Sequence, residues 1–227
     1  RPLQSLLLLF TQEFAVSVLR LPKLPSNSAK QLWGNLPGAS QGLVVAEAAR
    51  SAKRFTLLLT DNSQSAVRLK EELAFFSPEL PVLHFPDWET LPYDVFSPPQ
   101  DIISQRMATL YQLPQLQQGI LVVPINTALH RLAPQSFTLD SSLILDVGQK
   151  LDVESMRNRL QASGYQCVET VYEHGEFAVR GALLDLFPMG SEVPYRIDLF
   201  DDEIESLRTF DPETQRSSEK VKSVRLL

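Results

Sequence analysis

The residues whose types and spacing could do chemistry begin at Gly38, in the stretch GASQGLVVAEAAR. Gly38, Ser40 and Gly42 form a G-x-S-x-G pattern, which is typical of a serine nucleophile on a strand-to-helix turn. Such a turn needs an incoming strand, and Pro37 disfavours a central strand there. None of the three histidines lies in a recognisable end-of-strand loop beside a paired acid. The sequence therefore disfavours hydrolase chemistry.

The same stretch lies where a phosphate-binding loop is expected. In G-x-x-x-x-G-K-[ST] the backbone N–H groups surround the phosphates, the lysine reaches the β and γ oxygens, and the hydroxyl holds Mg²⁺. Gly38 is followed by neither Gly-Lys-Ser nor Gly-Lys-Thr, and Ser40, Gln41 and Gly42 supply no ammonium group. We expect a helix capped by Ser40 at the position of a lost nucleotide site, with no catalytic residue and no cofactor in this chain.

Metal chemistry has equally little support in the sequence. Three histidines and one cysteine are spread along the chain without converging spacing, and Cys167 has no CxxC partner. The acids of DLFDDEIE, from Asp198 to Glu205, lack the spacing of a calcium loop and favour a solvated hairpin turn. We expect no metal site.

The composition describes an ordinary globular chain of 227 residues with 44% hydrophobic and 21% charged residues. A net charge of −6 argues against a broad basic face that holds DNA, and a single cysteine fits a reducing compartment. The apolar run SLLLLF is far shorter than the ~20 residues that a membrane span requires. We expect a cytoplasmic protein with no membrane partner.

The elements that must position these residues fall into two groups. Up to about residue 146, apolar strands alternate with helical patterns, which predicts a parallel sheet covered on both faces. A proline-rich loop from Phe85 to Pro99 interrupts them, and it is either functional or a packed cover over the sheet. The expected elements are a helical pattern at 28–36, a helix at 42–53, a strand at 54–61, a helix from Asn62 or Ser63 to 76, a strand at 80–86, a helix from Asp101, and a strand that runs into a helix at 119–132.

The second group begins with a helix at 151–165, for which Asp152 is the expected N-cap. Alternating patterns and turn residues then predict antiparallel strands at 167–172, 175–188, 195–200, 204–210 and 221–227. We therefore expect an N-terminal extension at 1–25, an α/β domain at 26–146 and an α+β domain at 147–227.

Alternation places Arg180, Arg196 and Phe200 on outward faces of these strands. Two arginines and an exposed phenylalanine are typical of a protein–protein hot spot. The alternative is that both arginines pair with Asp185 or Asp198 across the strands, and the spacing alone favours that pairing.

Two long blocks, at Asp87–Leu113 and Glu173–Asp211, resemble the bacterial transcription-repair coupling factor (Mfd) family. The second block, EHGEFAVRGALLDLFPMGSEVPYRIDLFDDEIESLRTFD, also resembles the domain that the excision-repair protein UvrB uses to bind UvrA. The resemblance covers residues 20–227. It implies that 26–146 form a degenerate helicase-like, P-loop-type domain and that 147–227 form a UvrA-interaction domain.

The resemblance also implies roles for particular residues. The arginine of the RGALLDLFP motif falls on Arg180, the arginine before the DLFDDEI hairpin on Arg196, and the aromatic residue before the two acids on Phe200. The implied function is a non-catalytic module that recruits UvrA. Contacts with RNA polymerase and DNA, and the motor that uses ATP and Mg²⁺, belong to other regions of the longer family proteins. The alternative is a weakly active nucleotide- or DNA-binding helicase-like domain.

Overall fold

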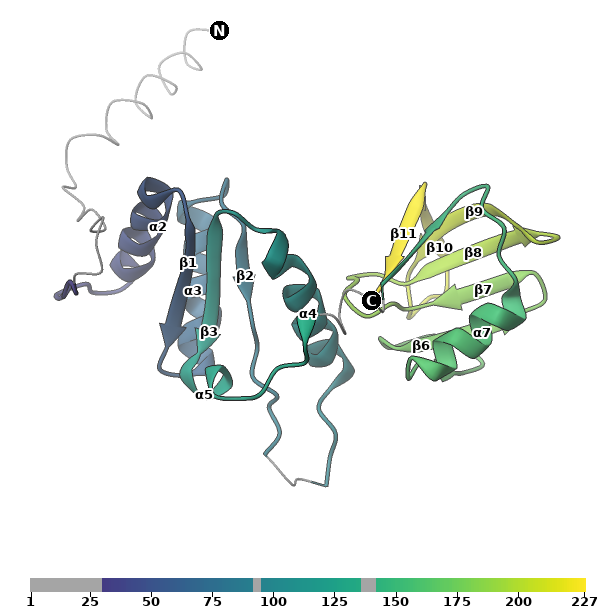
Figure 1. Ribbon diagram of the computed structural model, residues 1–227, viewed down its shortest axis with the longest axis horizontal. Coiled ribbons are helices and arrows are strands. Elements are labelled where there is room, and N and C mark those ends of the chain that lie inside the picture. The colour runs from purple at the N-terminus through teal and green to yellow at the C-terminus, as the bar shows by residue number, and fades with distance from the viewer. Residues whose placement is uncertain (1–29, 92–94, 136–141) are drawn as a thin grey trace, which may run out of the picture.

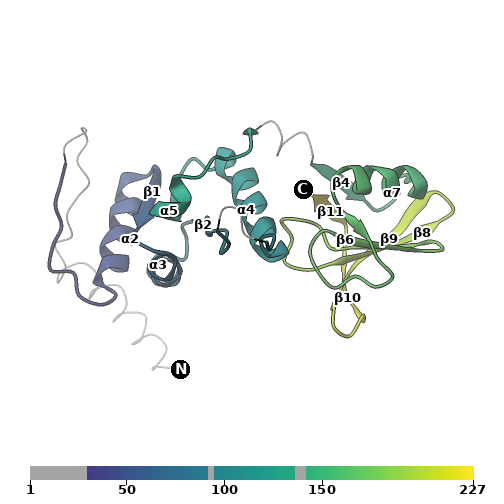
Figure 2. The same ribbon diagram turned by 90° about the horizontal axis from the view of Figure 1, so that it is seen from below.

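The computed structural model describes residues 30–91, 95–135 and 142–227. An α/β domain and a β-rich domain lie side by side, and helix α4 (Gln100–Gln112) lies between the parallel sheet and the β-rich domain in both views (Figure 1, Figure 2). The expected N-terminal extension at 1–25 lies outside the described residues.

The sheet of the first domain is parallel, as predicted, with the strand order β1-β3-β2. The central strand β3 is buried along its whole length because apolar side chains alternate onto two covered faces. The strands are β1 (Phe55–Thr60), β2 (Val82–His84) and β3 (Gly119–Pro124), and the short helix α5 (Ile125–Ala128) follows β3.

Helices α2 (Ser40–Ala52) and α3 (Ser63–Phe76) cover one face of this sheet, and α4 with the 3₁₀ turn η1 (Leu113–Gln115) packs on the other. Ile120 and Val122 point towards α2 and α3, whereas Leu121 and Val123 point towards α4. The mixed α/β class with a parallel sheet is thus confirmed.

Two predicted details of this domain are wrong. Ala39, not Ser40, is the N-cap of α2, because the Ser40 hydroxyl turns back and donates to the Pro37 carbonyl at 2.6 Å. Residues 30–36 contain no helix, although their pattern predicted one. The predicted N-cap Asp152 is confirmed, and of Asn62 and Ser63, the two residues at which α3 was expected to begin, Asn62 is the N-cap. Each accepts a hydrogen bond from the backbone N–H three residues on.

The proline-rich loop is fixed at its base by a buried cation. The Arg106 guanidinium of α4 lies between the rings of Phe85 and Trp88, 4.0 and 3.8 Å from their centroids, and donates to the Pro86 carbonyl at 2.6 Å. Burial lowers the pKa of Arg106 to about 10. Asp87 accepts hydrogen bonds from the side chains of Asn126 and Thr127 in α5. The base of the loop is therefore a packed cover at the edge of the sheet.

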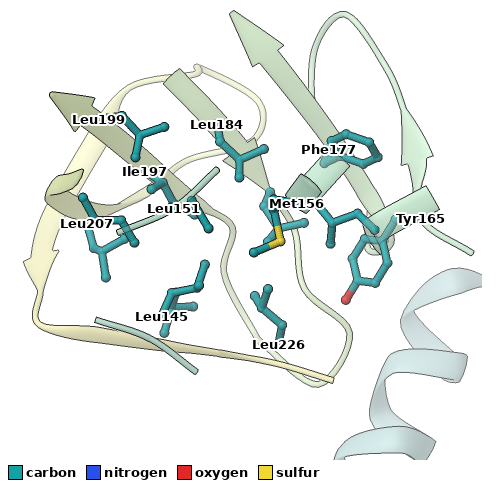
Figure 3. Packing of buried hydrophobic residues seen from close by; sticks show 14 residues of the cluster. Leu145, Leu151, Met156, Tyr165, Phe177, Leu184, Ile197, Leu199, Leu207 and Leu226 are labelled. Atoms are coloured by element: carbon teal, nitrogen blue, oxygen red, sulfur yellow. The ribbon is translucent and has the colours of Figure 1, made fainter. Parts of the chain in front are cut away.

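The second domain is built on a six-stranded sheet in the order β10-β9-β8-β7-β6-β5, covered on one face by α7 (Val153–Ala162). Leucine, isoleucine and aromatic side chains fill the space between them (Figure 3). The strands are β5 (Gln166–Cys167), β6 (Glu176–Arg180), β7 (Leu183–Leu186), β8 (Tyr195–Phe200), β9 (Glu203–Phe210) and β10 (Ser217–Val221).

Four features of this domain differ from the expectation. The predicted strand at 175–188 is divided by the turn at Gly181–Ala182 into β6 and β7, which pair in the antiparallel direction. The predicted strand at 167–172 shrinks to β5, which pairs in parallel with β6. The predicted strand at 221–227 divides between β10 and β11 (Ser223–Leu226). Strand β11 pairs with β4 (Leu143–Asp146), and Leu145 is buried in the second core. The residues of β4 therefore pack with the second domain, although we expected that domain to begin at 147.

Candidate protein-binding surface

A row of polar side chains crosses the face of the six-stranded sheet that α7 leaves uncovered. The register of the antiparallel strands aligns Asp185 of β7 with Arg196 of β8, and Arg196 with Arg208 of β9. Arg208 in turn lies opposite Lys220 of β10. Directly opposed side chains are close enough to interact, so these strands form one charged surface.

Asp185 is the buried centre of this surface. Its side chain has no solvent exposure, and its carboxylate forms ion pairs with both Arg180 and Arg196. A second group of residues, Val171, Ala178, Phe187 and Phe210, forms a small core on the same face and shields the carboxylate from water. A buried carboxylate without cationic partners would be costly, so the two arginines are required for this packing.

Arg196 is held by the sheet and the following loop. It donates from Nε and Nη2 to Asp185 at 2.7 and 2.9 Å, and from Nη1 to the Gln215 carbonyl and the Ser217 hydroxyl at 3.1 and 3.2 Å. Its guanidinium also lies 4.9 Å from the centroid of the Phe210 ring. Hydrogen bonding to Asp185 raises the pKa of Arg196 above its usual value.

Arg180 is more accessible, because it is the last residue of β6. The β6–β7 turn follows at once, and Gly181 occupies its left-handed position with φ of 62°. A two-residue turn with glycine first suits the twist of the paired strands. The Arg180 side chain is 45% exposed, and its bond to Asp185 uses one Nη atom.

Phe200 lies at the same end of the sheet as Arg180, since the amide of its neighbour Leu199 donates to the carbonyl of Ala182 in the β6–β7 turn. It is 70% exposed and ends β8. The two-residue loop Asp201–Asp202 follows, and Lys150 binds the Asp202 carboxylate at 2.8 Å. That hydrogen bond lowers the pKa of Asp202. The hairpin thus presents the phenyl ring on a fixed turn.

The structure brings the three predicted residues onto one face and distinguishes their environments. Phe200 and Arg180 reach solvent, whereas Arg196 is mostly enclosed, with 15% of its side chain exposed. The cross-strand pairing that the spacing favoured is present, because both arginines form ion pairs with Asp185. Asp198 instead accepts a hydrogen bond from the Ser206 hydroxyl and forms an ion pair with Arg208. Sequence reasoning had named Asp185 only as a pairing option, and the covering group of apolar residues was not foreseen.

The stretch around Gly38 has a different geometry. Gly38 has φ of 56° in the turn before α2, and Gly42 packs so closely on α3 that an added Cβ would lie 2.6 Å from Glu72. The side-chain oxygen Oε1 of Gln41 accepts a hydrogen bond from Arg68 at 3.3 Å beside an open pocket of about 430 Å³. In this geometry Gly42 allows α2 and α3 to pack closely, and the Ser40 hydroxyl is hydrogen-bonded to the Pro37 carbonyl.

Within residues 30–91, 95–135 and 142–227, no three His, Cys, Asp or Glu side chains come together as metal ligands. In the same part of the chain, no helix combines the length and apolar character needed to cross a bilayer.

Comparison with known proteins identifies the class that the second domain resembles: residues 143–227 match the family model described as the UvrB interaction domain. This range includes β4, in agreement with its pairing to β11.

The longer comparison confirms the resemblance to transcription-repair coupling factors. The chain is 50% identical over 205 residues to the transcription-repair-coupling factor of Escherichia coli (strain K12). It is 48% identical over 208 residues to that of Haemophilus influenzae and 33% identical over 196 residues to that of Staphylococcus aureus (strain USA300). These matches cover 90%, 91% and 86% of this chain but 18%, 18% and 17% of the relatives. The chain thus spans less than a fifth of their length.

Proposed function

We propose that this chain is a non-catalytic recruitment module that binds UvrA through the outward face of its second domain, as a mimic of UvrB. The observation that carries the proposal is the exposed Phe200 beside the partly exposed Arg180, within the residues that match the UvrB interaction domain. An aromatic ring and an arginine fixed at the ends of short turns have the composition of an interface hot spot.

We further propose the setting in which this module works. The longer protein is a coupling factor that delivers excision repair to lesions at which RNA polymerase stalls in the cytoplasm. Contacts with RNA polymerase and DNA, and the ATP-driven motor, belong to regions outside these 227 residues. In this proposal the first domain is a degenerate helicase-like domain that binds no nucleotide, and the absence of a Gly-Lys-Ser or Gly-Lys-Thr sequence after Gly38 supports that part.

Calorimetric titration of the 227-residue chain with purified UvrA tests the proposal. We expect saturable binding that the charge reversal Arg180→Glu weakens by at least about 30-fold, the scale of a hot-spot residue. Arg157→Glu is the matched control, because Arg157 is exposed on α7, on the opposite side of the sheet. No binding by the wild-type chain, or equal losses in the two variants, would contradict the proposal.

The alternative, a nucleotide-binding first domain, is separated by a second titration with fluorescent ATP and Mg²⁺. The pocket beside Gln41 and Arg68 is where a nucleotide would be expected to bind. Micromolar affinity that is lost in Gln41→Ala would favour the alternative, and we expect none.

A further inference from the structure

The guanidinium of Arg196 has almost no hydrogen-bonding capacity left for a partner. A guanidinium carries five N–H donors. Arg196 makes four hydrogen bonds, two to Asp185 and one each to Gln215 and Ser217, through all three of its nitrogen atoms. With 15% of the side chain exposed, it has little surface to offer as well.

Arg180 differs in each of these respects. Its side chain is 45% exposed, and only Nη2 is bonded to Asp185. Its Nε and Nη1 donors make no hydrogen bond within the described part of the chain. Arg180 can therefore donate hydrogen bonds from Nε and Nη1 to a partner carboxylate while Nη2 remains bonded to Asp185.

We propose that Arg196 and Asp185 are positioning residues and that Arg180, with Phe200, makes the contact with UvrA. This inference rests on the proposed function. Arg196 holds the Asp185 carboxylate from both oxygens, so that the oxygen Oδ2 that it shares with Arg180 is fixed in place.

Loss of Arg196 would leave Arg180 as the remaining cationic partner of the Asp185 carboxylate. Asp185 has no exposure, so it would then depend on Arg180 alone for compensation. Because an uncompensated buried carboxylate is costly, Arg180 would be drawn towards it and away from the surface. Removal of Arg196 should therefore abolish the contribution of Arg180 to binding, although Arg196 itself touches little of the partner.

A double-mutant cycle of UvrA binding with the 227-residue chain tests this division of roles. We expect Arg180→Ala and Arg196→Ala each to weaken binding by about 30-fold, and the double variant to lose little more than either single variant. Arg196→Lys should behave like Arg196→Ala, because an ammonium group cannot reproduce the fork on Asp185. Arg196→Ala combined with Phe200→Ala should instead give multiplied losses.

If Arg196 contributed only to global stability, Arg196→Ala would weaken UvrA binding by the same factor in the wild type, in Arg180→Ala and in Phe200→Ala. A smaller effect in Arg180→Ala alone therefore distinguishes a positioning role from a purely structural one. Circular dichroism at the titration temperature ensures that only folded variants are compared. Multiplied losses for the two arginines, or near wild-type affinity of Arg196→Lys, would overturn the inference while UvrA binding by the wild type stands. A wild-type chain that does not bind UvrA would overturn the proposed function itself, and with it this inference.

Discussion

Truncation of Phe200 separates binding from folding more cleanly than any other change on this surface. Phe200 is 70% exposed, so the free protein loses little packing in Phe200→Ala. We expect its free energy of unfolding to change by less than about 1 kcal/mol, as is usual for surface positions in strands.

The expected loss of affinity follows from the area that binding would cover. An aromatic side chain offers about 200 Å², of which about 140 Å² is open in Phe200, and burial at about 25 cal/mol per Å² amounts to about 3.5 kcal/mol. Side-chain ordering and incomplete cover reduce this figure, so we expect a loss of about 2 kcal/mol, or about 30-fold in Kd.

Phe75→Ala is the matched control for this measurement. Phe75 is 79% exposed on α3 in the first domain, and its ring contacts Phe76 with centroids 5.2 Å apart. Its truncation removes the same atoms far from the proposed surface. Calorimetric titration with UvrA should show the loss in Phe200→Ala alone. Wild-type affinity of Phe200→Ala would remove the β8–β9 hairpin tip from the interface and refute the reasoning.

Three further predictions concern the fold. Arg106→Ala should lower the free energy of unfolding in urea by about 3 kcal/mol, since it removes a buried cation from two aromatic rings and a carbonyl; a loss below about 1 kcal/mol would show that the base of the loop is not fixed by it. Burial, and then the charge of Lys70, lowers the pKa of His84 in the folded protein. As the pH falls below about 6.5, His84 is therefore protonated in the unfolded chain before it is protonated in the folded protein, and the free energy of unfolding should decrease. Urea titrations at several pH values should give a shallower fall for His84→Gln, and an unchanged slope would contradict the assignment. Gly42→Ala should destabilise α2 despite the better helix propensity of alanine, because its Cβ would lie 2.6 Å from both Cβ and Oε2 of Glu72. Only Glu72→Gly removes both atoms, so Gly42→Ala should lower the melting temperature less in a Glu72→Gly background than in the wild type, and an equal loss in both backgrounds would contradict the clash.

The strands that carry the surface were predictable because their alternation is regular. At Tyr195–Phe200, apolar and polar side chains alternate between a covered and an open face, and the structure has a strand with the predicted bounds. The segment at 167–172 has a similar pattern but finds a pairing partner for only two residues, in parallel with β6. Pairing depends on which strand lies beside a segment, and a local pattern does not contain that information.

The burial of Asp185 was not predictable for a related reason. Its position on the outward face of β7 indicates exposure, yet it has none, because Phe187, directly after its own strand, packs with Val171 and Phe210 from two other segments on that part of the face. The residues that compensate it were visible in the sequence as pairing options. What could not be seen was that one carboxylate takes both arginines while Asp198 takes Arg208.

This arrangement explains why an accessible and an enclosed arginine belong to one surface. Arg180 alone, at the end of β6 beside a glycine turn, would sample many rotamers and would lose that freedom on binding. The buried carboxylate of Asp185 restrains it beforehand, and Arg196 makes a buried carboxylate tolerable at that position. The six-stranded sheet therefore determines both the position and the orientation of the Arg180 guanidinium, and a substitution of Asp185 or Arg196 should affect partner binding through Arg180.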